Sequence, residues 1–152
     1  MKNVYITAIA AALPNEPVTN DQMERVLGQA GDQPSRARRV ILKSNKIKTR
    51  YYAVDPQTGE RTHTNAELTA EAIRALGAPY AQELDCLVCG TSLPDQLMPN
   101  HAVMVHGELA NPPCEVVATA GVCLAGISAL KYGWMSVATG QHKRVVSTGS
   151  EV

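Results

Sequence analysis

The chain has 152 residues, enough for one domain with a hydrophobic core, and its 45% hydrophobic and 18% charged residues are ordinary for a globular protein. Fourteen basic residues balance fourteen acidic ones, which argues against a general nucleic-acid or membrane-surface binder. No apolar run reaches the roughly 20 residues that a membrane-spanning helix needs.

The N-terminus and the cysteines favour a cytoplasmic protein. Lys2 and the apolar run over residues 4–13 mimic a short signal peptide, but the run starts with β-branched residues and ends in Leu13-Pro14, as a buried strand would. Nothing else in the sequence indicates secretion, so we expect the four cysteines to be reduced thiols. They are Cys86, Cys89, Cys114 and Cys123.

The N-terminal third predicts two extended segments and two short helices. In chain order these are a buried strand over 3–12, a helix capped by Thr19 or Asn20, a helix from Pro34-Ser35 to about Asn45, and an extended segment over 47–54. A turn follows at 55–59, where Asp, Pro and Gly cluster.

The rest of the chain predicts alternating helices and strands. Thr64 and Glu67 form a capping-box pattern that opens a helix stopped by Gly77. The elements that follow are a strand over 84–89, a helix over 99–110, a strand over 115–120, a helix over 122–139 and a strand over 144–150. Such alternation favours a parallel or mixed sheet covered on both sides. A sheet ending at that last strand would have little to cover its edge, so we expect the natural domain to continue.

A basic stretch lies between Asp32 and Asp55, where no acidic residue occurs. Its members are Arg36, Arg38, Arg39, Lys43, Lys46, Lys48 and Arg50. One interpretation is a solvated helix face followed by an edge strand. The other is a docking site for an anionic partner, such as a phosphopantetheine carrier or coenzyme A.

Cys123 is the candidate nucleophile. A strand runs into Gly121, which can take the positive φ of a sharp turn, and Cys123 follows in the first turn of a helix. A helix N-terminus stabilises an anion by at most about 2 kcal/mol. At about 1.4 kcal/mol per pKa unit, this lowers a thiol pKa from about 8.5 to about 7. The alternative is that Cys123 is a small buried core residue.

The other metal-ligating and nucleophilic residue types predict no site. Cys86 and Cys89 have CxxC spacing, but residues three apart on a strand point to opposite faces. His101 and His106 are five apart on a helix and do not form a ligand pair. His142 is expected to be exposed to solvent. We therefore predict no metal.

The segment Ala-Gly-Val-Cys-Leu-Ala-Gly at 120–126 resembles the nucleophile segment of β-ketoacyl-acyl-carrier-protein synthase III, a condensing enzyme of the thiolase fold. Further matching segments are Ala12-Leu13-Pro14, Val18-Thr19-Asn20, Ile47-Lys48-Thr49-Arg50, Cys89-Gly90-Thr91-Ser92, Asn100 to Leu109 and Gly149-Ser150-Glu151. Together they cover nearly the whole chain in order. Details at 48–53 and 104–109 are similar to the aryl-polyene and dialkylresorcinol branch.

The resemblance implies an α/β fold in which residues 1–152 form the N-terminal half of a thiolase-like protein. That half would hold a mixed five-stranded sheet covered by helices, with the Cys123 helix buried at its centre, in a homodimer. Thr91, Leu97 and Met98 would line an acyl pocket. The alternative for Leu97 and Met98 is ordinary packing under the loop that carries them.

The implied activity is that of an acyltransferase in fatty acid, aryl-polyene or polyketide biosynthesis. Cys123 would take an acyl group from an acyl carrier protein or coenzyme A thioester, with no bound cofactor. The acyl group would then be condensed with a malonyl- or ketoacyl-carrier thioester by Claisen chemistry. Gly121 would form the turn, and the backbone N–H of Cys123 would contribute to the oxyanion hole.

Two departures limit what carries over. The family's catalytic His and Asn come from the second half of the fold, which these 152 residues do not include. Members primed by coenzyme A have a tryptophan that stacks on adenine before the segment at Ile47, whereas this chain has Val40-Ile41-Leu42 there and only Trp134 elsewhere. A carrier-bound acyl donor is therefore favoured. The alternative function is a non-catalytic α/β domain that docks a partner through residues 36–50.

Overall fold

The computed structural model describes residues 2–29, 31–33, 35 and 37–152, and it divides the chain into two compact units. The larger unit comprises the residues up to Ala12 together with Thr64–Val152, and the smaller unit comprises Leu13–His63. Arg36 of the predicted basic stretch lies outside the described residues. Among the described residues, no helix is both long enough and apolar enough to span a membrane.

A three-stranded parallel sheet forms the centre of the larger unit. Its strand order is β4-β3-β5, with β3 at Cys86–Gly90, β4 at Glu115–Thr119 and β5 at Val145–Gly149. The three strands run in register, so that Cys86 pairs with both Glu115 and Val145 at the start of the sheet. The predicted parallel arrangement is therefore confirmed for these strands.

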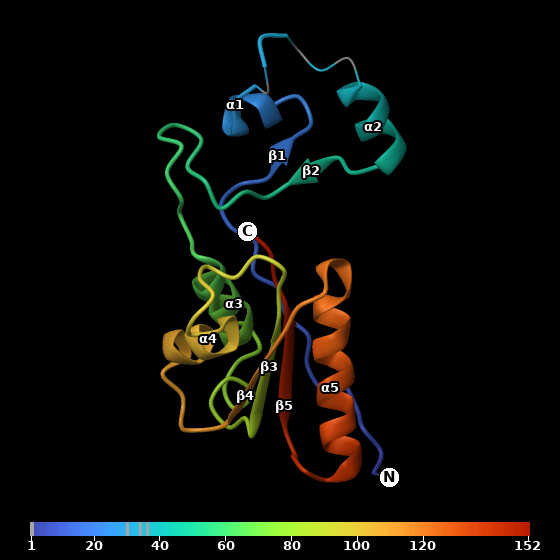
Figure 1. The fold of residues 1–152 in the computed structure, drawn as a ribbon, viewed down its shortest axis with the longest axis vertical. Helices are drawn as coiled ribbons and strands as arrows, with labels where there is room; N and C mark the ends of the chain where they lie inside the picture. The colour runs from blue at the N-terminus through green and yellow to red at the C-terminus, as the bar shows by residue number, and fades with distance from the viewer. Residues whose placement is uncertain (1, 30, 34, 36) are drawn as a thin grey trace. The chain divides into compact units, whose positions relative to one another are not determined.

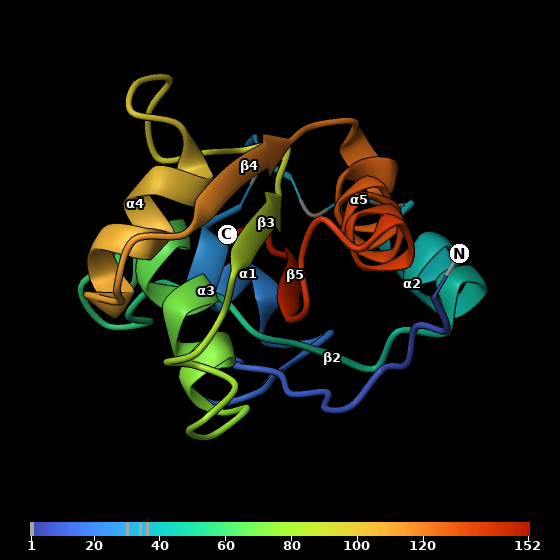
Figure 2. The same ribbon diagram turned by 90° about the horizontal axis from the view of Figure 1, so that it is seen from below.

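Helices cover both faces of this sheet, as the alternating sequence pattern predicts. Two helices, α3 (Asn65–Arg74) and α4 (His101–Leu109), lie on one face, and α5 (Ala125–Thr139) lies on the other (Figures 1 and 2). This layered α/β architecture agrees with the predicted fold class.

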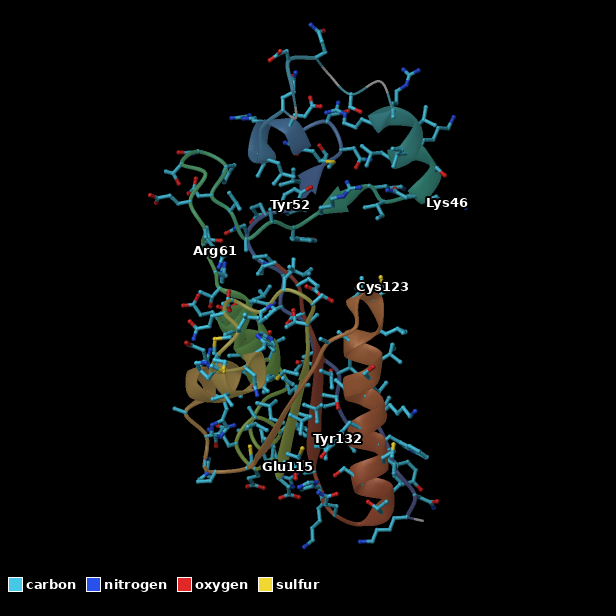
Figure 3. All side chains as sticks on the ribbon, viewed as in Figure 1. Lys46, Tyr52, Arg61, Glu115, Cys123 and Tyr132 are labelled. Carbon is cyan, nitrogen blue, oxygen red and sulfur yellow. The ribbon has the colours of Figure 1, made fainter. Side chains whose placement is uncertain are left out.

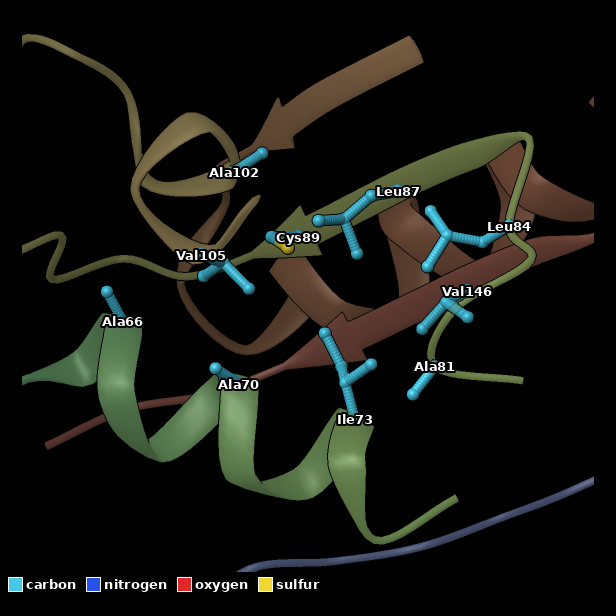
Figure 4. Packing of buried hydrophobic residues seen from close by; sticks show 10 residues of the cluster. All are labelled: Ala66, Ala70, Ile73, Ala81, Leu84, Leu87, Cys89, Ala102, Val105 and Val146. Atoms are coloured by element: carbon cyan, nitrogen blue, oxygen red, sulfur yellow. The ribbon is translucent and has the colours of Figure 1, made fainter. Parts of the chain in front are cut away.

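The main core lies between β3 and the pair α3 and α4 (Figure 4). Among its apolar side chains, Ile73, Leu87 and Val105 are almost completely buried. Burial of one such side chain contributes about 1.5–3 kcal/mol. Every residue of β3 is buried, which explains why its sequence is apolar at successive positions instead of alternating.

The capping box predicted for α3 is present. The Thr64 hydroxyl accepts a hydrogen bond from the Glu67 amide at 3.1 Å, and the Glu67 carboxylate accepts one from the Thr64 amide at 2.8 Å. Ala66, Ala70 and Ile73 then form the buried face of the helix. Gly77 follows the helix with φ of 82°, the left-handed conformation expected of a stop.

Only one face of α5 is buried in this chain. Ala125, Ala129 and Gly133 face the sheet, where their small size lets the helix approach closely. The opposite face exposes apolar side chains, namely Leu124, Ile127, Leu130, Trp134 and Met135. The prediction of a helix buried at the centre of the domain is therefore wrong for the 152 residues themselves, because they supply cover for one side only.

The predicted five-stranded sheet is also wrong. The residues over 3–12 do not form a strand. Just before them, the Lys2 amide donates to the Ala138 carbonyl at 2.9 Å. Tyr5, Ile6 and Ile9 are exposed. An apolar, β-branched run predicts a strand, but a strand forms only where a neighbouring strand is available to pair with it.

The smaller unit contains a two-stranded antiparallel sheet and two short helices. β1 (Val18–Thr19) pairs with β2 (Thr49–Arg50), and the helices are α1 (Met23–Leu27) and α2 (Arg38–Asn45). Both predicted helices are present, but the N-cap of α1 is Gln22. Thr19 donates its hydroxyl to the Gln22 side chain at 2.9 Å, and Asn20 donates to the Ile47 carbonyl at 2.9 Å, so neither caps the helix.

Candidate active site

A sharp turn connects β4 to α5. Gly121 has φ of 151°, and the next residue, Val122, has φ of 50°. Gly121 thus has the positive φ that the sequence predicts. A β-branched residue in the left-handed region is uncommon and costs about 1–2 kcal/mol. Such strain persists only where the surrounding structure imposes it, and it concentrates at functional sites.

Cys123 lies in the turn that opens α5. Val122–Leu124 form one turn of 3-10 helix, closed by a hydrogen bond of 2.9 Å from the Leu124 amide to the Gly121 carbonyl. The Cys123 side chain is exposed (Figure 3). The alternative that Cys123 is a buried core residue is therefore wrong for this chain.

The other three cysteines, all of which lie among the described residues, are less accessible to solvent than Cys123. Cys86 and Cys89 are buried and Cys114 is half-buried. Burial raises the pKa of the Cys86 thiol to about 12 and that of Cys89 to about 11. Cys86 and Cys89 pack into different core clusters, which confirms that they point to opposite faces of the strand. Cys123 is thus the cysteine best placed to react with a substrate.

Close backbone packing holds the start of α5 against the sheet. Gly90, at the end of β3, has no room for a Cβ atom, which would lie 2.7 Å from the Gly126 nitrogen. Gly126 itself faces Gly149 of β5, and a Cβ on it would lie 3.2 Å from the Gly149 Cα. The Thr119 hydroxyl donates to the Ala125 carbonyl at 2.9 Å. These contacts fix the position of the turn that carries Cys123.

The three acyl-pocket candidates differ in burial. Thr91 is buried, accepts a hydrogen bond from the Asn65 side chain at 2.9 Å and donates to Glu151 at 3.3 Å. Leu97 and Met98 lie in the loop before α4 and are 87% and 85% exposed. Their role in an acyl pocket remains a prediction.

A buried polar cluster lies near the end of β5. The His101 Nε2 atom lies 3.3 Å from the Thr69 hydroxyl and 3.2 Å from the Ser150 hydroxyl, which themselves share a hydrogen bond of 2.8 Å. Burial lowers the pKa of His101 below its ordinary value. Sequence reasoning missed this cluster, because its members come from two helices and a strand end.

The basic stretch lies in the smaller unit. Arg38 forms an ion pair with Glu24 at 2.9 Å, whereas Arg39, Lys43, Lys46 and Lys48 are exposed. A shallow groove on this unit is lined by Arg39, Val40, Lys43, Ser44 and Lys46. The solvated-face interpretation fits most of the stretch, and the groove leaves the docking interpretation open.

The prediction that His142 is solvent-exposed is wrong. Its side chain is only 12% exposed, and its Nε2 atom lies 3.6 Å from a carboxylate oxygen of Glu115. Its Nδ1 atom is hydrogen-bonded to the Ser136 hydroxyl. The chain after α5 turns back over the sheet instead of projecting into solvent, and sequence spacing does not reveal this return.

Comparison with solved structures places the fold in a class. A β-ketoacyl-acyl-carrier-protein synthase III from Thermus thermophilus is 24% identical with a TM-score of 0.73, over 95% of this chain and 41% of that one. AbyA1, a tetronic acid condensing enzyme, is 29% identical with a TM-score of 0.69, over 88% of this chain and 40% of that one. The fold is therefore thiolase-like, of the kind found in condensing enzymes.

Sequence comparison leads to the same group of proteins. The β-ketoacyl-acyl-carrier-protein synthase III of Xanthomonas euvesicatoria pv. vesicatoria (strain 85-10) is 28% identical over 152 residues, which is 99% of this chain and 44% of that protein. The chain is thus a homologue of these synthases, as the resemblance in the sequence predicts. It spans less than half the length of the relatives that it matches. No protein-family model matches the chain.

Proposed function

We propose that this chain is the nucleophile-bearing part of a ketosynthase III-like condensing enzyme, with Cys123 as the acyl acceptor. The observation that carries the proposal is the exposed thiol of Cys123 at a strained strand-to-helix turn. Homology to β-ketoacyl-acyl-carrier-protein synthases III supports the same assignment. The substrates are acyl thioesters.

The reaction has two steps. The Cys123 thiolate attacks the carbonyl carbon of an acyl thioester, a new C–S bond forms, and the donor thiol leaves with a proton. A carbanion, formed from a malonyl-carrier thioester by loss of CO2 or from a ketoacyl-carrier thioester by loss of a proton to a base, then attacks the carbonyl carbon of the acyl-enzyme. A C–C bond forms, and the Cys123 thiolate is released.

Two features of the turn assist both steps. The first turn of α5 directs unpaired backbone amides toward its N-terminus, where they attract the negative charge that develops during the reaction. The Cys123 amide is positioned to hold the oxyanion of the tetrahedral intermediate, and loss of one such donor typically costs about 10²–10³ in rate. Gly121, with its φ of 151°, permits the turn that leads into Cys123.

The exposed face of α5 supports the proposal that further protein completes the site. Leu124, Ile127 and Leu130 are apolar and exposed on this face, and the relatives are more than twice as long as the aligned region. We propose that additional chain covers the face and supplies the catalytic His and Asn that the resemblance implies. This chain by itself would then be acylated without completing the condensation.

The proposal extends to partners. An acyl carrier protein is the favoured donor, and its phosphate-bearing arm would be attracted to Arg39, Lys43 and Lys46 around the groove of the smaller unit. The complete protein would be a cytoplasmic homodimer. Leu97 and Met98, which are exposed in this chain, would contribute to an acyl pocket once a second chain is present.

Intact-mass measurement after incubation with acyl-coenzyme A and acyl-carrier thioesters tests the assignment. We expect one acyl adduct that Cys123→Ala abolishes. Cys114→Ala is the matched control, because Cys114 is half-buried and away from the turn, and it should leave the adduct unchanged. Absence of an adduct, or labelling spread equally over the four cysteines, would contradict the proposed role of Cys123.

The second candidate is a non-catalytic domain that docks a partner. The groove lined by Arg39, Lys43 and Lys46, with Val40 and Ile41 exposed nearby, favours it. Titration with an acyl carrier protein separates the two functions. Arg39→Glu combined with Lys43→Glu would abolish binding in both cases, whereas acylation by a small coenzyme A thioester would survive only if the chain is also an acyl acceptor.

A further inference from the structure

Three metal-ligating side chains converge at the edge of the sheet where the parallel strands begin. They are Cys86 on β3, Glu115 on β4 and His142 in the connection from α5 to β5. The Cys86 Sγ, a Glu115 carboxylate oxygen and a ring nitrogen of His142 all lie within 4.8 Å of one another. The proposed acylation chemistry uses none of these residues.

The strand register brings the first two ligands together. Cys86 and Glu115 are paired residues on neighbouring parallel strands, so their side chains project from the same face of the sheet. This is the face that α5 covers, where Cys86 packs near Ala129 and Tyr132. Ligand atoms on such a framework are held by the sheet rather than by flexible loops.

Asp85 anchors the backbone around all three ligands. Its carbonyl accepts a hydrogen bond from the Glu115 amide at 3.1 Å, and its amide donates to the Arg144 carbonyl at 2.9 Å. Its carboxylate accepts hydrogen bonds from the amides of Lys143 and Arg144 at 2.8 Å and 3.0 Å. The residue before Cys86 thus fixes Glu115 and the residues directly after His142.

Outer hydrogen bonds orient the ligands. The Ser136 hydroxyl bonds to His142 Nδ1, which leaves Nε2 directed at Glu115, 3.6 Å from its carboxylate oxygen. Tyr132 donates its hydroxyl to the other oxygen of Glu115, and Gln141 donates to the carboxylate at 3.2 Å. Partners of this kind set the ring orientation and the charge of metal ligands in known metal sites.

We propose that Cys86, Glu115 and His142 bind a divalent transition metal ion such as Zn²⁺. Sulfur, imidazole nitrogen and carboxylate oxygen are the donors that Zn²⁺ prefers, at roughly 2.0–2.3 Å from the metal. Ligand atoms on a tetrahedral ion lie roughly 3.3–3.7 Å apart at those bond lengths. The three ligand atoms, which lie within 4.8 Å of one another, need to move only slightly closer to bind an ion. Three protein ligands leave a fourth position for water.

The charges of the ligands balance the ion. A thiolate and a carboxylate together neutralise a divalent cation, which reduces the cost of placing charge against the sheet. Cys86 is completely buried, so its thiol is neutral when no metal is bound. On binding, the Cys86 proton passes to solvent and an S–metal bond replaces the S–H bond. Glu115 and His142 are partly exposed, and they provide the route by which the ion enters.

The site is separate from Cys123. Glu115 begins β4, whereas the turn that carries Cys123 follows the end of the same strand. Figure 3 shows Glu115 and Tyr132 far along the unit from Cys123. The five residues of β4 span about 16 Å at a rise of about 3.3 Å per residue. The bound ion therefore stabilises the sheet and does not take part in acyl transfer.

Titration of the purified, chelator-treated chain with Co²⁺ tests the site, because cobalt bound to a thiolate gives a charge-transfer absorption in the near ultraviolet. We expect one equivalent to produce the band and Zn²⁺ to displace it. Cys86→Ser should abolish the band, and His142→Asn should weaken binding by more than about 100-fold. Ser136→Ala should weaken it by about 10–100-fold, as loss of an outer partner does.

Matched variants make the result specific. Cys123→Ser and His106→Asn remove the same residue types outside the cluster and should leave the titration unchanged. Circular dichroism would show that Cys86→Ser and His142→Asn remain folded, and Cys123 acylation should persist in both. Absence of the band in the unmodified chain, or a band that survives Cys86→Ser, would overturn the proposal.

Discussion

Gly90, the last residue of β3, lies directly against the backbone of Ala125, the first residue of α5. A Cβ atom on Gly90 would overlap the Ala125 carbonyl and lie 2.7 Å from the Gly126 nitrogen. All of these neighbours are backbone atoms, so no side chain can move to make room. The contact sets how closely the helix that follows Cys123 approaches the sheet.

Gly90→Ala is therefore expected to destabilise the larger unit by about 1–3 kcal/mol, the usual cost of overpacking, and to displace the Cys123 turn. Urea unfolding followed by fluorescence of Trp134, the only tryptophan, measures the stability. Gly107→Ala is the control, because a Cβ on Gly107 meets nothing within 4 Å and alanine favours a helix by about 1 kcal/mol. Equal behaviour of the two variants would contradict the packing argument.

Val122→Asn is expected to stabilise the larger unit by about 1 kcal/mol, because asparagine tolerates the left-handed conformation better than a β-branched residue does. Val122 is 73% exposed, so little apolar burial is lost. Urea unfolding followed by Trp134 fluorescence also measures the stability of this variant. Val103→Asn, on α4, serves as comparison, since Val and Asn have similar helix propensities and no strain is relieved there. A loss of stability in Val122→Asn would show that the turn is not strained.

Thr64→Ala is expected to cost about 0.5–2 kcal/mol by removing the capping box of α3. The hydroxyl accepts the Glu67 amide at 3.1 Å, and alanine leaves that donor without a side-chain acceptor. Thr64→Ser keeps the hydroxyl and should retain most of the stability. Thermal unfolding of the three proteins compares them, and identical midpoints for Ala and Ser would refute the capping role.

Protonation of His101 is expected to make the protein less stable toward acid pH. Burial lowers the pKa of His101 in the folded state, although Asp95 and Glu151 act in the opposite direction. As the pH falls below about 6.5, the ordinary histidine pKa, the unfolded chain takes up this proton before the folded chain does. The free energy of unfolding therefore decreases.

Urea unfolding between pH 8 and pH 5 measures this effect. His101→Gln should show a weaker decrease than the unmodified chain. These pH values lie above the range in which ordinary carboxylates titrate, about 3.9–4.3. A pH dependence that is unchanged in His101→Gln would assign the effect to another group.

The sequence predicts those parts of the fold that depend on local signals. The capping box at Thr64, the apolar runs of β3 to β5 and the glycine turn before Cys123 each act within a few residues. By contrast, the pairing of strands and the burial of helix faces depend on residues that are far away in the sequence. Residues 3–12 have the composition of a strand but do not form one, and α5 carries apolar side chains on a face that this chain leaves exposed.

The candidate functional residues likewise fall into those that local sequence predicts and those that it does not. Cys123 is identifiable because turn, nucleophile and helix start are consecutive in the sequence. The cluster of Cys86, Glu115 and His142 is not, because it depends on the register between β3 and β4 and on the return of the chain after α5. Leu97 and Met98 illustrate the remaining difficulty, since exposure in this chain leaves their eventual neighbours undefined.

The position of β3 between two strands has a consequence for amide hydrogen exchange. Its backbone is paired on both sides, whereas β4 and β5, within the described residues, are each paired with β3 alone. The amides of β3 should therefore exchange last and report the global unfolding free energy, and those of the outer strands should exchange through smaller openings. β3 carries Cys86 at one end and Gly90 at the other. The segment that should exchange most slowly therefore connects the proposed metal site with the residue that packs against the start of α5.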